Sequence, residues 1–199
     1  MKKFALAMAF GAVLATAGQA SAQVAWDAPF LTPPRVEPGL GLYLTDPAAG
    51  DIGFVGTWRA PGKSRNLGFR LGLANDRRDE LSVFGGVDVS GVLTRSSRDF
   101  PLDIDWVFGA GLGVGDFALI SFPLGLSVGH TFDADGVRFT PYLTPRVALD
   151  ARMGGGVDSS VDMSFTVDLG LDISFQPNWK IRFGGSFGDR DAVALGIVF

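Results

Sequence analysis

The sequence VDMSFTVDLGLDISF, from Val161 to Phe175, decides the fold class. Its odd positions carry large apolar side chains, and its even positions carry polar side chains or glycine. Because side chains alternate across a β-strand, one face of this strand is apolar and the other holds Asp162, Asp168 and Asp172. Strands of soluble proteins usually have about 3–10 residues. Unbroken alternation over the whole stretch instead predicts a tilted strand that crosses a membrane.

The same alternation continues through most of the chain after residue 38. It predicts ten strands, at residues 39–45, 51–59, 66–74, 80–93, 103–114, 117–132, 137–151, 160–175, 178–187 and 191–199. The connections are rich in turn residues and too short for helical crossovers, so neighbouring strands are expected to be antiparallel. The predicted fold class is all-β, an antiparallel up-and-down transmembrane β-barrel with both termini in the periplasm.

Eight strands is the alternative count. Pro141 and Pro145 lie within the predicted strand 137–151, where each removes a ladder hydrogen bond, so they mark either bulges or a frayed strand. The connections 60–66 and 94–102 would be periplasmic turns in this topology, and such turns are usually short.

The first 38 residues differ from the rest. Residues 1–22 combine Lys2 and Lys3, an apolar run and the small residues Ala20-Ser21-Ala22, a pattern typical of a signal peptide cleaved before Gln23. Residues 23–38 contain four prolines and no periodicity, which predicts an extended, non-sheet periplasmic leader. Residues 39–199 then form the barrel domain.

Composition excludes several classes of function. The chain has no cysteine, which excludes disulfides, thiolate metal sites and a lipid anchor on cysteine. The formal net charge is −4 and there is no basic stripe, so nucleic acid is not an expected partner. No apolar run reaches the length of a transmembrane helix after the signal. We expect no cofactor and no metal.

Three features predict that the apolar face points outward, as in a membrane barrel, rather than inward, as in a lipocalin-like barrel. The polar face is rich in glycine, which would leave room in a narrow lumen for long side chains from the opposite wall. The apolar face carries almost no charge. Its aromatic residues fall near one end of the strands, as in an interfacial girdle; the tryptophans of this set are Trp58, Trp106 and Trp179.

The last strand, DAVALGIVF, places Val193, Leu195, Ile197 and Phe199 on one face. It is similar to the C-terminal strand of Gram-negative outer-membrane β-barrel proteins, and the chain resembles small OmpA-, OmpX- or OmpW-like barrels in architecture. The resemblance implies that these four residues are an assembly signal, read by the barrel-assembly machinery. It also implies location in the outer membrane after Sec-type export.

Charged residues of both signs are expected on the inner face. A turn near Pro177 would place Asp172 opposite Arg182, which predicts a cross-strand ion pair. Arg146 is expected within reach of Asp168 or its diagonal neighbours. We favour a role in filling and rigidifying the lumen over a selectivity constriction, because barrels of eight to ten strands leave little free bore.

No catalytic residues are predicted. His130, the single histidine, falls on the apolar face near the periplasmic rim by parity, away from Asp168 and from a nucleophile. A Ser–His–Asp arrangement requires its members within hydrogen-bond reach. GAGLGVGD does not satisfy the spacing of a nucleotide-binding loop, and DADG at 133–136 lacks the other ligands of a calcium loop.

The favoured function is that of a structural or surface-interaction barrel with a narrow, charge-plugged lumen. The alternative is a narrow passive channel or conduit for small or hydrophobic solutes, and the distant alternative is a membrane-embedded lipid-modifying enzyme. The expected partners are outer-membrane lipid and lipopolysaccharide, besides the assembly machinery, and the expected state is a monomer.

Overall fold

The protein is a β-barrel. The computed structural model describes residues 26–48, 50–60, 62, 65–76, 81–115, 117–154 and 159–199, so the predicted signal peptide lies outside the described residues. The strands are β1 (Gly39–Asp46), β2 (Gly50–Ala60), β3 (Arg65–Asp76), β4 (Leu81–Thr94), β5 (Asp103–Val114), β6 (Ala118–Gly129), β7 (Phe132–Ala134), β8 (Val137–Met153), β9 (Ser160–Gln176), β10 (Trp179–Gly188) and β11 (Ala192–Val198). Within this described part, no helix is long and apolar enough to cross a membrane.

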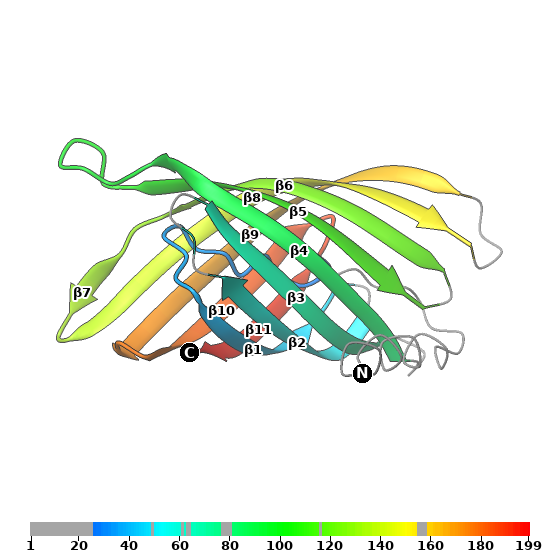
Figure 1. The fold of residues 1–199 in the computed structure, drawn as a ribbon, viewed down its shortest axis with the longest axis horizontal. Coiled ribbons are helices and arrows are strands. Elements are labelled where there is room, and N and C mark those ends of the chain that lie inside the picture. The colour runs from blue at the N-terminus through cyan, green and yellow to red at the C-terminus, as the bar shows by residue number, and fades with distance from the viewer. Residues whose placement is uncertain are drawn as a thin grey trace, which may run out of the picture.

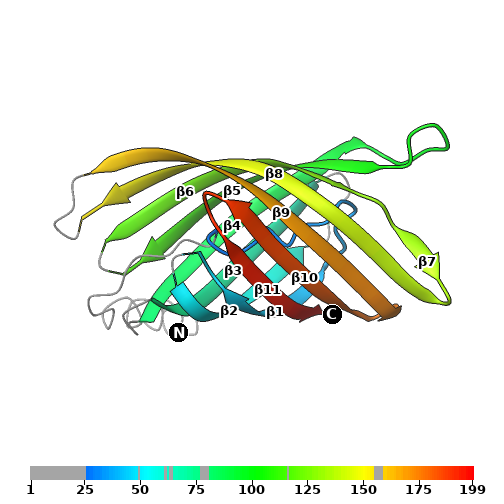
Figure 2. The same cartoon turned by 180° about the vertical axis from the view of Figure 1, so that it is seen from behind.

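Ten strands form the closed wall. Sequential strands pair antiparallel from β1 to β6 and from β8 to β11, β1 pairs with β11, and β6 pairs with β8 to close the ring. The three-residue β7 continues beyond β6 and pairs with β8 alone (Figure 1). From the opposite side, β8 and β9 cross the wall as its longest strands (Figure 2). The predicted all-β antiparallel barrel and its ten strands are confirmed, and the alternative of eight strands is wrong.

The prolines of β8 cause a local gap rather than a bulge. Pro141 and Pro145 pair in continuous register with Leu171 and Val167 of β9. Towards β6, pairing stops at Gly125–Arg146 and resumes at Val128–Leu143 in the same register. The expectation of a bulge is therefore wrong, and the expected loss of ladder pairing is found on the β6 side alone, because β9 holds β8 in place.

The apolar face of the strands points outward. In β9, Val161, Met163 and Phe165 are exposed, whereas Thr166, Asp168 and Asp172 are buried in the barrel interior. The same division holds around the wall, since the exposed large apolar side chains lie on the outer face of every strand of the ring. The orientation predicted from the glycine-rich polar face is confirmed.

The barrel has two distinguishable ends. The near end, as we call it, holds Phe199, the first residues of β1, β3, β5, β8 and β10 and the last residues of β2, β4, β6 and β9. The far end holds the opposite ends of these strands and the first residues of β11. The strand ends that flank 60–66 and the whole connection 94–102 lie at the near end, as the predicted topology requires. The connection 94–102 is tied to the wall, since Asp103 accepts a hydrogen bond from the Ser96 amide.

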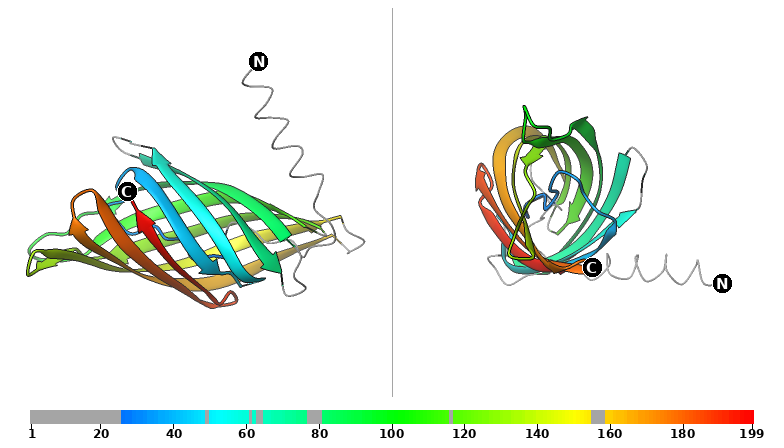
Figure 3. Two further views of the ribbon diagram at one scale, coloured as in Figure 1. Left: turned by 90° about the horizontal axis from the view of Figure 1, so that it is seen from below. Right: turned by 90° about the vertical axis from the view of Figure 1, so that its left-hand side faces the viewer.

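Residues 26–38, which we call the plug, run through the inside of the barrel. Seen along the barrel axis, this segment crosses the lumen within the ring of strands (Figure 3). It contains no strand, as predicted, but Trp26, Phe30 and Thr32 are completely buried. The prediction of a periplasmic leader separate from the barrel is thus wrong for these residues. Apolar side chains between the prolines give the segment enough surface to bury inside the wall.

The plug runs between the two ends of the barrel. Near its start, Asp27 accepts a hydrogen bond from the amide of Ala48, in the β1–β2 connection at the far end. It joins β1 at Gly39, at the near end, where Leu40 and Phe199 exchange two backbone hydrogen bonds. The first described residues therefore lie towards the end opposite Phe199. The placement of both termini in the periplasm remains a prediction.

Candidate functional site: the plugged lumen

The predicted ion pair between Asp172 and Arg182 is buried inside the barrel. The two residues are direct cross-strand partners of β9 and β10. Arg182 Nε lies 2.6 Å from Asp172 Oδ1, and Nη2 lies 2.7 Å from Oδ2, so the pair is bidentate. Both side chains are almost completely buried. Fork-like pairing of this kind gives fixed geometry as well as energy, so it orients the remaining guanidinium nitrogen, Nη1, towards the Leu31 carbonyl and the Tyr43 hydroxyl.

The pair of Arg146 and Asp168 was also predicted correctly. Asp168 lies opposite Thr144 in the register of β8 and β9, so Arg146 reaches it diagonally. The distances are 2.9 Å from Nε to Oδ2 and 3.3 Å from Nη2 to Oδ1. The Ser186 hydroxyl donates a further hydrogen bond to Asp168 Oδ1. The carboxylate is therefore held by neighbours on both sides of β9.

A third buried ion pair was missed by the sequence analysis. Arg59 Nη1 of β2 lies 2.6 Å from Asp88 Oδ1 of β4, across the intervening β3. The residue of β3 that lies between them is Gly68, where a Cβ atom would come within 2.7 Å of Arg59 Nη1 and 2.6 Å of Asp88 Oδ2. Parity alone could have placed both side chains inside, but only the sheet register shows that glycine lets them meet.

The wall holds the plug mainly through hydrogen bonds to the backbone carbonyl groups of the plug. Arginine side chains of three different strands donate to them, and each donor comes from a different side of the lumen: Arg146 donates to Trp26 at 2.9 Å, Arg70 to Pro29 at 3.2 Å and to Phe30 at 2.5 Å, and Arg182 to Leu31 at 2.7 Å. Ser127 donates to the Thr32 carbonyl at 2.6 Å. In return, the Phe30 amide donates to Asp168 at 3.1 Å. The buried backbone of the plug thus obtains partners without joining the sheet.

Glycines of the wall make recesses for the plug side chains. A Cβ atom at Gly109 would lie 2.6 Å from the Trp26 ring, and one at Gly111 would lie 2.5 Å from its Nε1. On the other side of the barrel, a Cβ atom at Gly184 would lie 2.7 Å from Leu31. Arg70 stacks on the indole, 4.1 Å from the ring centroid of Trp26. The prediction that lumen glycines leave room for large side chains is confirmed, although these side chains come from the plug.

Glycines also accommodate side chains of the wall itself. Tyr142 of β8 lies over Gly170 of β9, its direct cross-strand partner, and Tyr43 of β1 lies over Gly196 of β11. The Tyr43 hydroxyl is 3.3 Å from Arg182 Nη1. These rings fill the lumen on the side of β9 to β11, opposite the Trp26 recess.

The near end of the plug is tied by charge. Arg35 Nε pairs with Asp103 at 2.8 Å, and its amide donates to Asp105. Lys180 bridges Glu37 at 2.5 Å. Between this part of the plug and the wall lies a polar cavity of about 380 Å³, which extends to Arg138 and Thr140 of β8.

The far end of the plug is also tied by charge. Arg190, in the β10–β11 connection, lies 3.3 Å from Asp27 of the plug. It also forms a close ion pair with Asp150 of β8. All three side chains are largely buried, so this arginine joins the plug to the wall at the end opposite Arg35.

The predicted aromatic girdle lies on the outer face at the near end. Trp58 is half exposed and stacks on Phe69, with ring centroids 5.5 Å apart. Trp106 lies under the guanidinium of Arg65, 6.0 Å from the ring centroid, and Trp179 contacts Phe175 at 5.9 Å. All three tryptophans thus lie towards one end of the barrel. Their role at a membrane interface stays a prediction.

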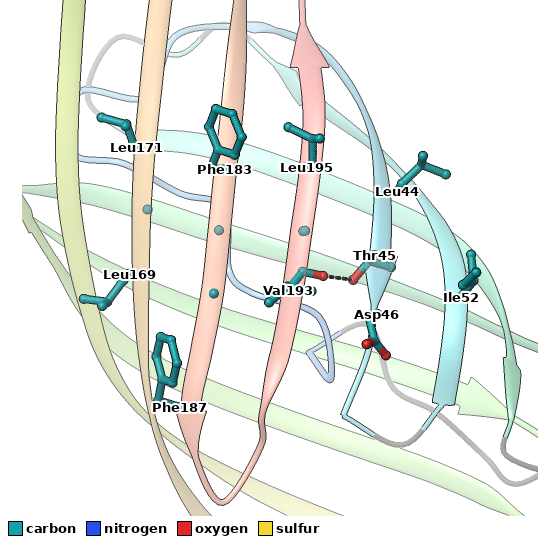
Figure 4. A pocket seen from close by; sticks show the side chains of 14 residues that line it. Leu44, Thr45, Asp46, Ile52, Leu169, Leu171, Phe183, Phe187, Val193 and Leu195 are labelled. Carbon is teal, nitrogen blue, oxygen red and sulfur yellow. Dashed lines mark hydrogen bonds between the residues drawn. The ribbon is translucent and has the colours of Figure 1, made fainter.

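The outer face is grooved where glycine replaces a large side chain. One groove, of about 700 Å³, runs over Gly185, with Phe183 and Phe187 on either side and apolar residues of β9 and β11 around it (Figure 4). Of the predicted assembly-signal residues, Val193 and Leu195 line this groove. Ile197 and Phe199 continue the same outer face towards the near end, and all four are exposed. Their role as an assembly signal stays a prediction.

His130 lies at the near end of β6, on the outer side predicted by parity. Its ring stacks on Phe132, with centroids 6.5 Å apart, and Phe132 stacks in turn on Phe139. Its Nδ1 atom is buried and has no hydrogen-bond partner in the structure. Among the described residues, no group of three or more His, Cys, Asp or Glu side chains is arranged to hold a metal ion.

No protein-family model matches the chain, and no curated protein matches its sequence. The geometry of the lumen and of the outer face therefore carries the functional argument.

Proposed function

We propose that the protein is a structural barrel of the Gram-negative outer membrane, with a lumen closed by its own plug. The observation that carries the proposal is the division of the wall, with large apolar side chains on the outer face and buried ion pairs on the inner face. In water such an outer face would be an aggregation hazard. In a bilayer it is what lipid requires of a spanning strand.

The surroundings of the wall fit the same proposal. The tryptophans of the near end suit a membrane interface, where an amphipathic ring has one apolar side and one wet side. The groove over Gly185 suits lipid acyl chains, which are flexible enough to fill an irregular apolar surface. Outer-membrane lipid and lipopolysaccharide are the partners of this face, and the barrel-assembly machinery is the partner during biogenesis. The barrel acts as a monomer.

A closed lumen favours a structural or surface-interaction role over a passive channel. The plug occupies the centre of the bore, and Trp26, Phe30 and Leu31 are packed there without solvent exposure above a few per cent. The proposal includes no enzymatic activity, because His130 lies on the outer face beside phenylalanines rather than in the polar lumen.

Two measurements test the proposal. After fractionation of a Gram-negative cell that expresses the full chain, the protein should be found in the outer membrane, with heat-modifiable mobility in electrophoresis. Recovery in the soluble periplasm would overturn the membrane role. In planar bilayers at low voltage the refolded protein should pass no steady current. A steady, ion-selective current would favour the alternative, a narrow channel for small solutes.

A further inference from the structure

The plug is bound inside a wall that is closed without it, and it contributes no strand to that wall. Strand pairing closes the wall completely without residues 26–38, because the ring of ten strands runs from β1 through β6, β8 and β11 back to β1. The plug is held chiefly by side chains of the wall that donate to its carbonyl groups. Removing it would therefore leave every ladder of the barrel in place.

Three buried ion pairs of the wall would also stay paired without the plug. Arg146 pairs with Asp168, Arg182 with Asp172, and Arg59 with Asp88, and all six residues belong to the wall. Arg146 and Arg182 each use one nitrogen for the plug while others stay on their carboxylates. An unpaired buried charge is strongly destabilising. Because these two arginines would keep their carboxylate partners, the plug could leave without creating such a charge at either of them.

The plug itself carries backbone strain. Leu31 and Arg35 have φ angles of 56° and 58°, in the left-handed region that is unfavourable for residues with a Cβ atom. These conformations persist because Arg182 holds the Leu31 carbonyl and Asp103 and Asp105 hold Arg35. Release of the plug would relieve the strain, whereas exposure of Trp26 and Phe30 opposes release. Burial of the aromatic rings thus favours the closed state, and the backbone strain of the plug reduces its stability.

A space for movement lies beside the plug at the near end. The polar cavity of about 380 Å³ is lined by Pro33, Pro34, Arg35 and Glu37 on one side and by wall residues on the other. The plug joins β1 at this end, so residue 39 can act as the fixed point about which the segment swings out.

We infer that residues 26–38 are a displaceable gate, and that their release turns the closed barrel into an open pore. The inference rests on the proposed function, because a pore has meaning only for a barrel that spans a membrane. It adds to that function a second state of the lumen, with the carbonyl-binding arginines as the latch.

A disulfide lock tests the gate in the full chain. A Cβ atom at Gly184 would lie 3.2 Å from Cβ of Pro29, close to the roughly 3.5–4.5 Å of disulfides, so Pro29→Cys with Gly184→Cys should join plug and wall. The chain has no other cysteine that could compete. The lock is closed by an oxidant and opened by dithiothreitol, which gives two states of the same protein in one bilayer.

Weakening the latch should open the gate. Arg70→Met removes the hydrogen bonds to the carbonyls of Pro29 and Phe30 and the cation on Trp26, and should raise the open probability at raised voltage about tenfold. Arg152→Met is the matched control, because Arg152 is half exposed, does not line the polar cavity beside the plug and pairs only loosely with Asp162. In the triple variant, the oxidised lock should abolish the openings of Arg70→Met, and dithiothreitol should restore them.

The outcomes separate the gate from the membrane role. If Arg70→Met inserts into vesicles, keeps heat-modifiable mobility and stays silent, the plug is permanent packing and the gate is refuted. If the oxidised lock leaves the openings unchanged, the current takes another path and the gate is again refuted. Failure of the wild-type chain to insert at all would instead count against the proposed function.

A second measurement covers the case in which Arg70→Met does not fold. The single variant Pro29→Cys is embedded in vesicles and treated with a hydrophilic maleimide. Loss of heat-modifiable mobility by the same variant in the same vesicles reports unfolding of the wall. A gate predicts that Pro29→Cys is labelled much faster than the folded, heat-modifiable form is lost. Equal rates for labelling and for this loss would mean that the plug leaves only when the barrel unfolds, and would refute the gate.

Discussion

The wall and the plug both bury backbone N–H and C=O groups, but these groups obtain their hydrogen-bond partners in different ways. In the wall, each strand exchanges hydrogen bonds with its two neighbours, and its side chains are free to divide between an apolar outside and a polar inside. In the plug, prolines and left-handed residues prevent pairing, and side chains of the wall supply the hydrogen bonds. The arginines of the lumen therefore serve two structures at once.

The different hydrogen bonding of the wall and the plug has an energetic consequence. The hydrogen-bond ladders of the wall are cooperative and repeat around the ring, so neighbouring strands compensate in part for the loss of a single hydrogen bond. The plug depends on a few charged donors, each worth about 1.5–3 kcal/mol. We therefore expect substitutions at the shared ion pairs to damage both structures, and substitutions within the plug or on the outer face to damage one.

The largest effect is expected at a shared ion pair. Asp172→Leu should lower the free energy of unfolding by about 3–5 kcal/mol, because it leaves the Arg182 guanidinium buried without its carboxylate. Urea unfolding of the protein in phospholipid vesicles measures the loss. The double variant Asp172→Leu with Arg182→Met should recover much of it, since the remaining charge is removed. A double variant as unstable as the single one would mean that Arg182 is needed for the plug rather than for the pair.

The next effect is expected within the plug. Phe30→Ala removes a fully buried ring, which costs about 3–5 kcal/mol in a protein core. In this protein, the loss cannot exceed the total contribution of the plug to the free energy of unfolding, because the wall closes without the plug. Amide hydrogen exchange should show faster exchange at the plug and unchanged protection in β9 and β10. Loss of protection throughout the wall would show that plug and wall are one cooperative unit.

A charge introduced on the outer face should lower the free energy of unfolding somewhat less than Phe30→Ala does. It should do so only when the barrel is surrounded by a membrane. Leu169→Arg places a guanidinium at the middle of β9, where lipid would raise the cost to about 2–4 kcal/mol, whereas Val161→Arg near the end of the strand should cost about 0–1 kcal/mol. Both positions are exposed on the outer face, at 49% and 72%. Equal and negligible losses of unfolding free energy would argue against a surrounding bilayer.

The wall was predictable from the sequence because its pattern is local. Alternation over Val161–Phe175 marks a strand without reference to any other residue, and the turn at Pro177 fixes the register that brings Asp172 to Arg182. The observed strands differ from the predicted ranges by one or two residues at most ends. The exception is 117–132, where the pairing of β6 ends at Gly129 and β7 follows as a separate short strand.

The plug was not predictable in the same way. Residues 26–38 have no periodicity, and their contacts join positions as distant as Phe30 and Asp168. Nothing local distinguishes a Pro-rich leader outside a barrel from one inside it. The available signal was the combination of Trp26, Phe30 and Leu31 with glycines on the inner face of β5 and β10, which implies a missing volume that some other segment must fill.

The smallest effect tests this volume argument. Gly109→Ala places a methyl group 2.6 Å from the Trp26 ring, which must shift in a recess that also includes Gly111, so we expect a loss of about 1–3 kcal/mol in unfolding free energy and a change in the tryptophan fluorescence. Gly85→Ala is the matched control in the neighbouring strand β4. Its methyl group would point outward, 3.5 Å from Leu71, and should be neutral or slightly stabilising, because it removes the backbone entropy of glycine. If both variants are neutral, Trp26 does not depend on the recess, and the plug is held by its carbonyl contacts alone.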